Sequence, residues 1–466
     1  MKRSANMLTS PLWSSLITYT IPIILTSILQ LLFNAADLVI VGRFSGSINV
    51  AAVSATGAIT NLIVNLFIGL SVGAGVTVAH ALGGNQSQEV YRTVHTALPT
   101  ALLGGILLSI IGVLFSESFL IMMKTPENVL PLSAKYMRIY FCGMTFTMVY
   151  NFCASILRAA GDTKSPLVFL SIAGVVNVLL NIFFVVVLHM TVDGVALATI
   201  ISQAISAMLV VVALMRRTDA CQLKLRKMRF YKQPFLKMIR IGLPAGIQSS
   251  MFAISNVIVQ SSINSFNSDA LMSGNGAASN IEGFVFVTMN SFHQTAVNFI
   301  GQNMGAHHYK RIKRIFTLCI LYVSLVGFAA GFTVWSFGEK LLRIYITDSP
   351  EAILCGLIRF NYVALPYFVC GLMDVSTGAL RGLGASFTPM VISILGVCGI
   401  RIMWIYTIFQ IPKFHTPECL YIAYLISWLA TFIFQTIAFI TIYKKRVRTD
   451  RNISHMPEFK KQGEIA

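Results

Sequence analysis

Twelve long apolar segments dominate the sequence, and each is long enough for a helix that crosses a membrane, which takes about 20 mostly apolar residues. Only 11% of all residues are charged and 56% are hydrophobic, too little charge for a water-soluble surface. We therefore exclude a soluble enzyme, a disordered chain and a secreted disulfide-rich domain. Pro22, Pro99, Pro244 and Pro366 lie inside these segments and are predicted to kink them. The expected spans are 12–41, 50–82, 90–116, 130–157, 166–188, 191–216, 235–265, 270–304, 309–337, 351–381, 389–410 and 418–443.

The basic residues predict how these spans are oriented. If the N-terminus is cytoplasmic, 26 of the 35 Lys and Arg residues lie on the cytoplasmic side and 8 on the outer side, with Arg401 left inside a helix. Positive charge gathers on the cytoplasmic side of membrane proteins, so we expect both termini there. The net charge of +18 is explained by this placement beside apolar segments, and we expect no nucleic-acid partner.

An internal repeat divides the chain into two halves. The run from Leu157 to Pro166 matches the run from Leu380 to Pro389, 223 residues later, and Pro22 matches Pro244. In each run we expect Gly to end one helix, Ser or Thr to cap the next, and Pro to open it. We predict an N-lobe (1–216, six helices), a basic cytoplasmic linker (217–234), a C-lobe (235–443, six helices) and a basic cytoplasmic tail (444–466). The predicted fold is an all-α polytopic membrane protein whose two six-helix lobes are related by a pseudo-two-fold axis along the membrane normal.

Only three acids, Asp37, Glu282 and Asp374, lie inside the apolar spans. A charged side chain at the centre of a bilayer costs about 2.5–3.5 kcal/mol on insertion scales, so such acids usually serve an ion path or a proton relay. The alternative is that each acid only pairs with a buried base or caps a broken helix. Amide side chains form three stripes at helical spacing, two of which include one of these acids. The amides either face the space between the lobes or bind neighbouring helices together. These stripes are Gln30, Asn34 and Asp37; Asn256, Gln260 and Asn264; and Glu282, Asn290, His293 and Gln294.

These features together resemble the multidrug and toxic compound extrusion (MATE) family over essentially the whole chain. The resemblance rests on the twelve-helix repeat, the Asp37–Gly42 run, the Leu157–Pro166 run and the Gly242–Gly246 run. It implies a bacterial exporter that alternates between inward-open and outward-open states. It also implies that Asp37 couples transport to a cation, and that Glu282 and Asp374 form a cation site that could hold Na⁺.

The sequence departs from one pattern of the family. Some proton-coupled members carry an acid on the fifth helix beside an Asn, whereas this chain has Asn177 and Asn181 there. A proton relay in the N-lobe would therefore depend on Asp37 with amides around it. For Arg401 two interpretations stay open: an ion pair with Glu282 or Asp374, or a side chain that extends to the outer surface. No His pair has metal-ligand spacing, so we assign none to a metal.

The sequence as a whole predicts a secondary active multidrug transporter of the bacterial cytoplasmic membrane. We expect it to exchange small organic cations for Na⁺ or H⁺ by rocking-type alternating access, because no GxxxxGK[ST] run indicates ATP hydrolysis. The expected partners are these substrates and membrane lipid, and we expect a monomer without a cofactor. One alternative is a lipid-linked oligosaccharide flippase, which would need a cationic cavity that only Arg401 offers. Another is an integral membrane enzyme, which would need a His/Asp cluster or an HExxH motif.

Overall fold

The computed structural model describes residues 6–123, 125–347 and 349–454, and in these ranges the chain is helical with no strand. The α-helices of the first half are α1 (Leu12–Ser45), α2 (Ser47–Gly83), α3 (Ser87–Met122), α4 (Leu130–Cys142), α5 (Met144–Ala159), α6 (Lys164–Ile182) and α7 (Val192–Met215). Those of the second half are α8 (Lys232–Asn264), α9 (Asp269–Gly305), α10 (Tyr309–Ser336), α11 (Gly338–Leu342), α12 (Pro350–Arg359), α13 (Phe368–Gly382), α14 (Phe387–Ser393), α15 (Ile400–Tyr406) and α16 (Pro417–Ser454). Short π segments are η1 (Phe183–Val187), η3 (Phe360–Ala364) and η5 (Ile394–Gly399), and short 3₁₀ turns are η2 (Leu225–Lys227), η4 (Leu365–Tyr367), η6 (Ile408–Gln410) and η7 (Pro412–Phe414).

The spans agree with the expected segments. Ten helical stretches of the described chain are long and apolar enough to cross a membrane, and α4 with α5, bent by 46°, forms an eleventh. The remaining long helix, α9, has 37 residues but carries many polar side chains. Helix α16 continues to Ser454, past the expected end of the last span at 443. Residues 455–466 of the expected tail lie outside the described residues.

The proline kinks stay predictions, because the helix bounds show where a helix is interrupted and not how far it bends. α1, α3 and α8 each continue as one helix through Pro22, Pro99 and Pro244. Only Pro366 coincides with a change of helix type, because it lies in the 3₁₀ turn η4 between η3 and α13. In the membrane, neighbouring helices and Ser or Thr side chains can satisfy the backbone groups that proline frees. The carbonyl that loses its N–H donor at Pro22 is that of Thr18, four residues earlier, whereas the Thr26 hydroxyl donates to the carbonyl of Pro22 itself at 2.6 Å.

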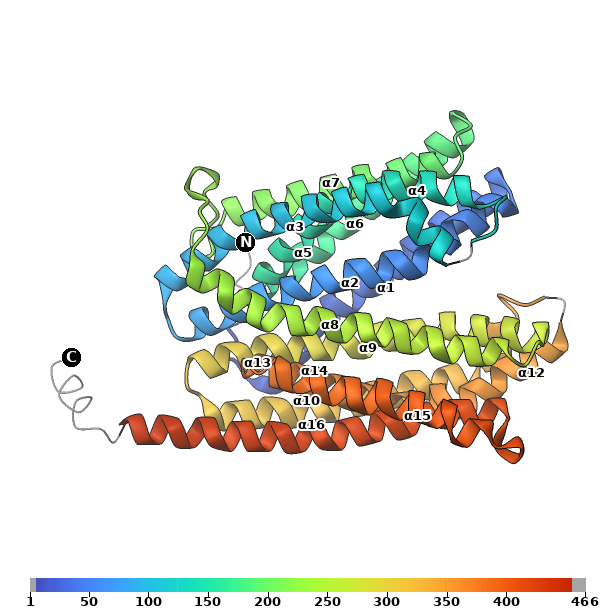
Figure 1. The fold of residues 1–466 in the computed structure, drawn as a ribbon. Helices are drawn as coiled ribbons and strands as arrows, with labels where there is room; N and C mark the ends of the chain where they lie inside the picture. Colours follow the sequence, from blue (N-terminus) through green and yellow to red (C-terminus); the bar gives the residue numbers. More distant parts are fainter. Residues whose placement is uncertain (1–5, 124, 348, 455–466) are drawn as a thin grey trace.

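The helices form two bundles, an N-lobe (α1–α7) and a C-lobe (α8–α16), which lie in the upper and lower halves of Figure 1. Each lobe has its own apolar core, and the core of the C-lobe also includes Leu12, Leu16, Tyr19 and Ile23 of α1. Helix α1 therefore belongs to the N-lobe by repeat but packs its first half against the C-lobe. That contact could not be inferred from a sequence division at 1–216.

The repeated decapeptide has the same backbone geometry in both lobes. Gly161 and Gly384 both adopt positive φ, at 88° and 82°, as the sequence predicted. Each is followed by a residue whose N–H donates back to a carbonyl of the preceding helix, Asp162 to Leu157 at 2.9 Å and Ala385 to Leu380 at 3.0 Å. The predicted Ser or Thr cap is wrong, because neither helix has a side-chain bond from its N-cap residue. In the first run Asp162 performs this role by accepting from the Ser165 N–H at 3.0 Å.

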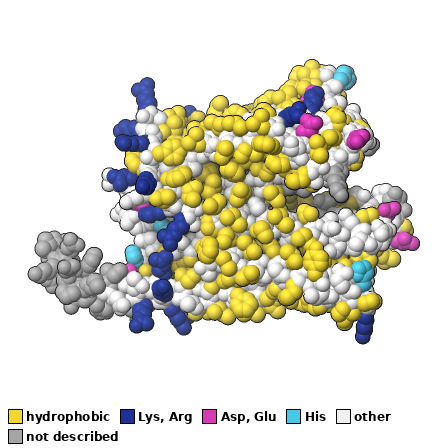
Figure 2. Space-filling model, in the orientation of Figure 1, with side chains coloured by type: hydrophobic (Ala, Val, Ile, Leu, Met, Phe, Trp, Pro, Cys, Tyr) yellow, Lys and Arg dark blue, Asp and Glu magenta, His cyan; other side chains and the backbone are white. Residues whose placement is uncertain are grey.

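The lobes touch at one end of the molecule and separate at the other. On the face drawn in Figure 2, Lys and Arg side chains gather at this contact end, at the left of the view, and we call it the basic end. Backbones meet there without side chains between them: a Cβ on Gly69 of α2 would lie 2.2 Å from the Gly246 nitrogen of α8. His80 of α2 bonds the Gly382 carbonyl of α13 at 2.7 Å. At the opposite end the halves part, leaving the recess visible at the right of Figure 2.

Candidate functional site

The polar centre of the N-lobe is built around Asp37. Asn181 of α6 donates from Nδ2 to Asp37 Oδ1 at 2.5 Å and lies 3.2 Å from Asn177 Oδ1. Both asparagines are buried, and the Asn181 Oδ1 atom is buried without a hydrogen-bond partner. The sequence-predicted trio of Asp37, Asn177 and Asn181 is therefore brought together. Its carboxylate can accept a proton, and its carboxylate and amide oxygens can ligate a hard cation.

The other amides of α1 are more open. Gln30 and Asn34 are both exposed, although they lie on the same helix face as Asp37. Exposed amides do not face lipid tails at this depth, because the hydrocarbon region offers them no hydrogen-bond partner. We therefore assign Gln30 and Asn34 to the recess side of α1, as one of the two sequence-based interpretations proposed.

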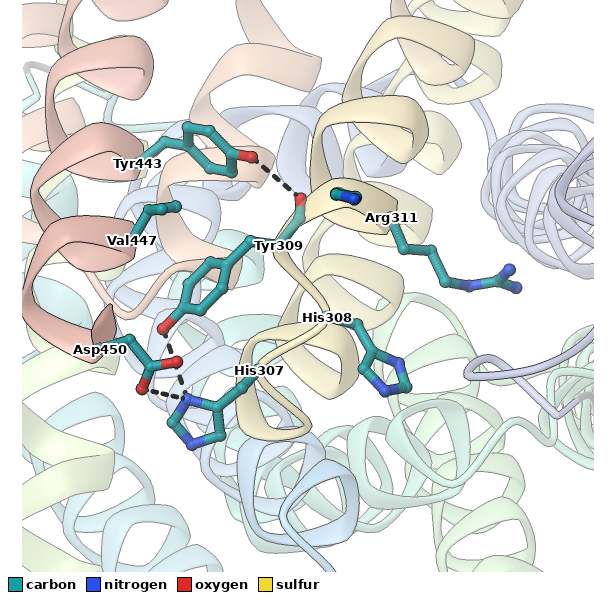
Figure 3. Close-up of a pocket in the computed structure, with 8 residues that line it drawn as sticks. His307, His308, Tyr309, Arg311, Tyr443, Val447 and Asp450 are labelled. Atoms are coloured by element: carbon teal, nitrogen blue, oxygen red, sulfur yellow. Dashed lines mark hydrogen bonds and ion pairs between the residues drawn. The ribbon is translucent and has the colours of Figure 1, made fainter. Parts of the chain in front are cut away.

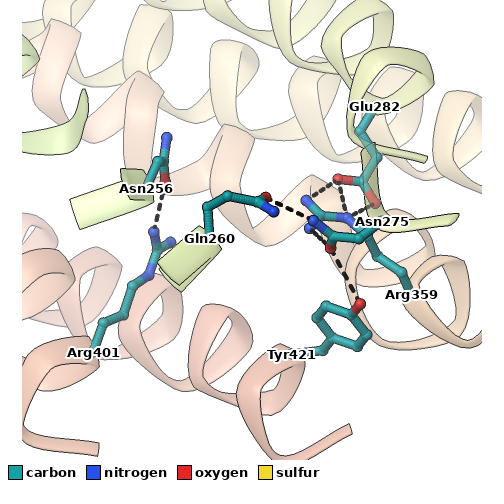
Figure 4. A network of polar contacts seen from close by, with 7 residues as sticks. All are labelled: Asn256, Gln260, Asn275, Glu282, Arg359, Arg401 and Tyr421. Carbon is teal, nitrogen blue, oxygen red and sulfur yellow. Dashed lines mark hydrogen bonds and ion pairs between the residues drawn. The ribbon is translucent and has the colours of Figure 1, made fainter. Parts of the chain in front are cut away.

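In the C-lobe, Glu282 is neutralised by a base that the sequence analysis placed outside. Arg359 of α12 donates from Nε and Nη2 to the Glu282 carboxylate of α9, with a shortest distance of 2.7 Å (Figure 4). The two side chains are almost fully buried, at 2% and 6% exposure. Arg359 also donates to Asn275 Oδ1 at 2.6 Å, and the Tyr421 hydroxyl donates to the same oxygen at 3.1 Å. Arg359 therefore balances the charge of the Glu282 carboxylate and also donates its hydrogen bonds.

Asp374 of α13 has a different set of neighbours. Its carboxylate lies 3.4 Å from Asn290 Nδ2, and its backbone carbonyl bonds His293 Nδ1 at 2.8 Å. Arg381 lies 3.3 Å from His293 Nε2 and donates to Gln248 Oε1 at 2.8 Å. Asp374 is buried, as are His293 and Arg381. This second cluster therefore joins α8, α9 and α13.

The expectation that Glu282 and Asp374 share one cation site does not match this geometry. Asn290, which contacts Asp374, is eight residues from Glu282 on α9, or about 12 Å along the helix axis. Across the described residues no group of three or more His, Cys, Asp or Glu could hold a metal ion. The two acids have separate partners because α12 and α13 meet α9 at different heights.

Both interpretations of Arg401 were wrong. Arg401 of α15 pairs with neither acid, and it does not extend to the surface, because its side chain is only 3% exposed. Its Nε donates to Ser427 Oγ at 3.1 Å and its Nη1 to Asn256 Oδ1 at 3.2 Å. The guanidinium carbon lies 4.1 Å from the centre of the Tyr424 ring. Arg401 is held by amide, hydroxyl and aromatic groups because the segment after Gly399 packs between α8 and α16.

The sequence analysis missed Arg359 and Arg381 as buried bases. It counted Arg359 as an outer residue and Arg381 as a cytoplasmic one, yet both are 6% exposed. One signal was available: Arg359 lies well inside the expected span 351–381. Arg381 is the second residue of a repeated run in which the matching residue, Arg158, is only half-buried, so the repeat did not indicate that Arg381 is buried.

Another group of polar side chains lines a cavity at the basic end. This cavity of about 500 Å³ lies between the start of α10 and the end of α16 (Figure 3). His307 pairs with Asp450 at 2.8 Å, and Tyr443 donates to the Tyr309 carbonyl at 3.1 Å. These contacts attach the extension of α16 to the loop between α9 and α10. Asp37, Glu282 and Asp374 do not line this cavity.

Comparison with known proteins gives consistent results. The MatE family model matches residues 22–183 and 244–407, two copies that begin at Pro22 and Pro244. The chain is 26% identical to the probable multidrug resistance protein YoeA of Bacillus subtilis, covering 84% of this chain and 85% of that protein. It is 28% identical to YpnP of the same organism, also a probable multidrug resistance protein, covering 83% and 86%. A solved outward-facing multidrug resistance MATE family transporter of the MOP superfamily superposes with a TM-score of 0.87 at 17% identity, covering 95% of this chain and 99% of that one.

Proposed function

Because the chain belongs to the MatE family of multidrug efflux transporters, whose members are not enzymes, we propose that it exchanges small organic compounds for Na⁺ or H⁺. One observation carries this proposal: a carboxylate, Asp37, lies in a membrane span without a basic partner among its hydrogen bonds, beside the unsatisfied Asn181 Oδ1. An uncompensated acid at this depth is costly and marks an ion path. The relatives named as multidrug resistance proteins support an organic substrate. They do not favour the alternative of a lipid-linked oligosaccharide flippase.

The coupling ion binds, in this proposal, at Asp37 in the N-lobe. Asp37, Asn177 and Asn181 supply oxygen atoms, which suit Na⁺ as a ligand set and H⁺ as an acceptor set. Glu282 is a poorer candidate, because Arg359 already neutralises it. Asp374 is the second candidate acid, since its hydrogen-bond partner Asn290 is uncharged.

Transport proceeds, in this proposal, by rocking of the two lobes. The lobes are closed at the basic end and parted at the opposite end, which corresponds to an outward-facing state if the basic end is cytoplasmic. Reaching an inward-facing state requires the α2–α8 contact at Gly69 and Gly246 to separate, together with the bond from His80 to Gly382. Ion binding at Asp37 would change the free-energy difference between these two states.

The proposed location is a bacterial cytoplasmic membrane with both termini inside. The concentration of Lys and Arg at the basic end supports this orientation. An impermeant thiol reagent applied to intact cells tests it. A single cysteine at 120–128 should be labelled and one at 222–230 should not, in a background without the exposed Cys142. The reverse labelling pattern would overturn the orientation.

Reconstitution into liposomes tests the proposed exchange. The purified chain should move a fluorescent organic substrate against its gradient when an opposing Na⁺ or H⁺ gradient is imposed, and movement should stop when an ionophore dissipates that gradient. Separate Na⁺ and H⁺ gradients identify the ion. Equal substrate movement with and without any ion gradient would contradict ion-coupled exchange.

A further inference from the structure

Among the described residues of the C-lobe, three buried arginines accompany two buried acids. Arg359 pairs with Glu282, and Arg381 belongs to the cluster around Asp374. Arg401 is left with neutral partners: Ser427, Asn256 and the rings of Tyr424 and Trp428. A guanidinium stays charged under all ordinary conditions, so the charge of Arg401 cannot be removed by deprotonation. An unmatched cation at this depth calls for an anionic partner that is not part of the lobe.

Asn256 connects Arg401 to the recess. Asn256 is eleven residues after Ala245 on α8, which is about three helical turns, so both residues lie on nearly the same face. Ala245 packs against α2, where a Cβ on Gly69 would lie 3.0 Å from the Ala245 carbonyl carbon. Further along this face the lobes have parted, and Asn256 is exposed.

The guanidinium of Arg401 lies directly behind this exposed amide (Figure 4). The Asn256 Oδ1 atom accepts a hydrogen bond from Arg401 Nη1 at 3.2 Å, and Asn256 is itself exposed. If that side chain turns aside, the same donor faces the recess. The Tyr424 ring, 4.1 Å from the guanidinium carbon, holds the arginine plane in place while this happens.

We propose that Arg401 and Asn256 form a recognition site for the carboxylate or phosphate group of a small organic substrate. The planar fork of arginine matches the geometry of both groups, and an anion supplies the charge that Arg401 lacks. The preferred substrates are then organic anions or zwitterions rather than the cations expected from the family resemblance. Asp37 and its amides, on the other lobe, stay available for the coupling ion. The inference deepens the proposed function, on which its transport consequences rest, but anion binding itself does not require ion coupling.

Binding to the purified full-length protein in nanodiscs is the primary test. The probes are fluorescein, an anion, and rhodamine ethyl ester, a cation with a related ring system. We expect fluorescein to bind more tightly, and Arg401→Gln to weaken fluorescein binding about tenfold or more, the usual effect of losing a charged hydrogen bond. Rhodamine ester binding should stay unchanged or improve. Arg343→Gln, at an exposed arginine that pairs with Glu339, is the matched control and should change neither probe.

A second variant keeps the test decisive if Arg401→Gln fails to fold. Asn256→Asp places a carboxylate beside Arg401 at an exposed position, so it should neutralise the site without disturbing the core. We expect weaker fluorescein binding and stronger rhodamine ester binding. Asn267→Asp, the same substitution at an exposed residue just after the end of α8, is the control and should leave both affinities within twofold of the unmodified protein.

The outcomes separate this inference from the proposed function. If fluorescein binds no better than rhodamine ester, and Asn256→Asp changes neither affinity, the anion site is wrong, whether or not ion gradients drive transport. If fluorescein binding depends on Arg401 but no ion gradient moves any probe in liposomes, the anion site stands and the ion-coupled exchange is wrong. Arg401→Lys separates charge from packing: it should retain part of the fluorescein affinity, whereas a purely structural role predicts the same loss as Arg401→Gln.

Discussion

The N-lobe and the C-lobe share a backbone plan but differ in charge. Among the described residues of the N-lobe, Asp37 accepts a hydrogen bond from the Asn181 amide, and no Lys or Arg is buried. In the C-lobe, Glu282 and Asp374 are accompanied by Arg359, Arg381 and Arg401. The repeat therefore preserved the positions where helices end, while the buried charges diverged. The difference indicates that the lobes have different tasks, with an uncompensated acid in one and an excess of base in the other.

The largest expected effect is on coupling in the N-lobe. Asp37→Asn should reduce ion-driven efflux to the leak rate of empty liposomes, because the amide keeps the shape of the side chain but cannot bind a proton or carry the charge. The folded yield should stay near that of the unmodified protein, since Asn181 keeps a partner. Efflux in liposomes and size-exclusion profiles measure the two quantities.

A matched control for this variant is Asp162→Asn at the start of α6. Asp162 accepts from the Ser165 N–H at a helix start, a role that asparagine fills equally well, so activity should be retained. Gradient-driven efflux that persists in Asp37→Asn would remove the ion-binding role assigned to the N-lobe.

The next effect is on the stability of the C-lobe. Glu282→Gln leaves the buried Arg359 guanidinium without its counter-charge, which should cost about 3–5 kcal/mol. Asp374→Asn should cost less, because its hydrogen-bond partner Asn290 is neutral. Thermal unfolding in detergent compares the variants.

A double-mutant cycle makes the ion-pair interpretation testable. Glu282→Gln combined with Arg359→Gln removes both charges, and we expect it to recover much of the stability lost in either single variant. Additive losses in the double variant would show that the two residues contribute independently, contrary to the contact seen between them.

A smaller effect is expected at the contact between the two lobes, where Gly69 of α2 meets Gly246 of α8. A Cβ on Gly246 would lie 2.0 Å from the Leu66 carbonyl oxygen, so Gly246→Val should disfavour closure of the basic end by about 1–3 kcal/mol. A cysteine at Asn256 should then become accessible to a thiol reagent from the basic end. Gly276→Val, at a helix position with no atom within 4 Å, is the control. Unchanged accessibility would show that this contact is not the closed gate.

The smallest effect concerns the repeated turns. Gly161→Val and Gly384→Val should each cost about 1–2 kcal/mol, because a side chain is strained at positive φ. Gly112 is unsuitable as a control, since its Cβ would lie 1.9 Å from the Phe141 ring. Gly283, with no atom within 4 Å, replaces it. Equal unfolding temperatures for Gly283→Val and the two turn variants would contradict the shared role of the turns.

The sequence by itself determined the helical spans, the repeat, the left-handed glycines and the three acids inside the membrane. Each of these follows from local properties: the hydropathy of a segment, the absence of a side chain at one residue, or a charge within an apolar run. Asn177 and Asn181 could be placed near Asp37 because the family resemblance aligned their helices. No knowledge of packing was needed for these predictions.

Only the tertiary structure decided which charges meet. Arg359 and Glu282 are 77 residues apart, and Arg401 and Asn256 are 145 apart, so no helical periodicity relates them. Helix periodicity gives the face on which a side chain lies but not the neighbour that covers that face. Buried charges are determined by their partners, and in this protein those partners come from helices that the chain brings together only on folding.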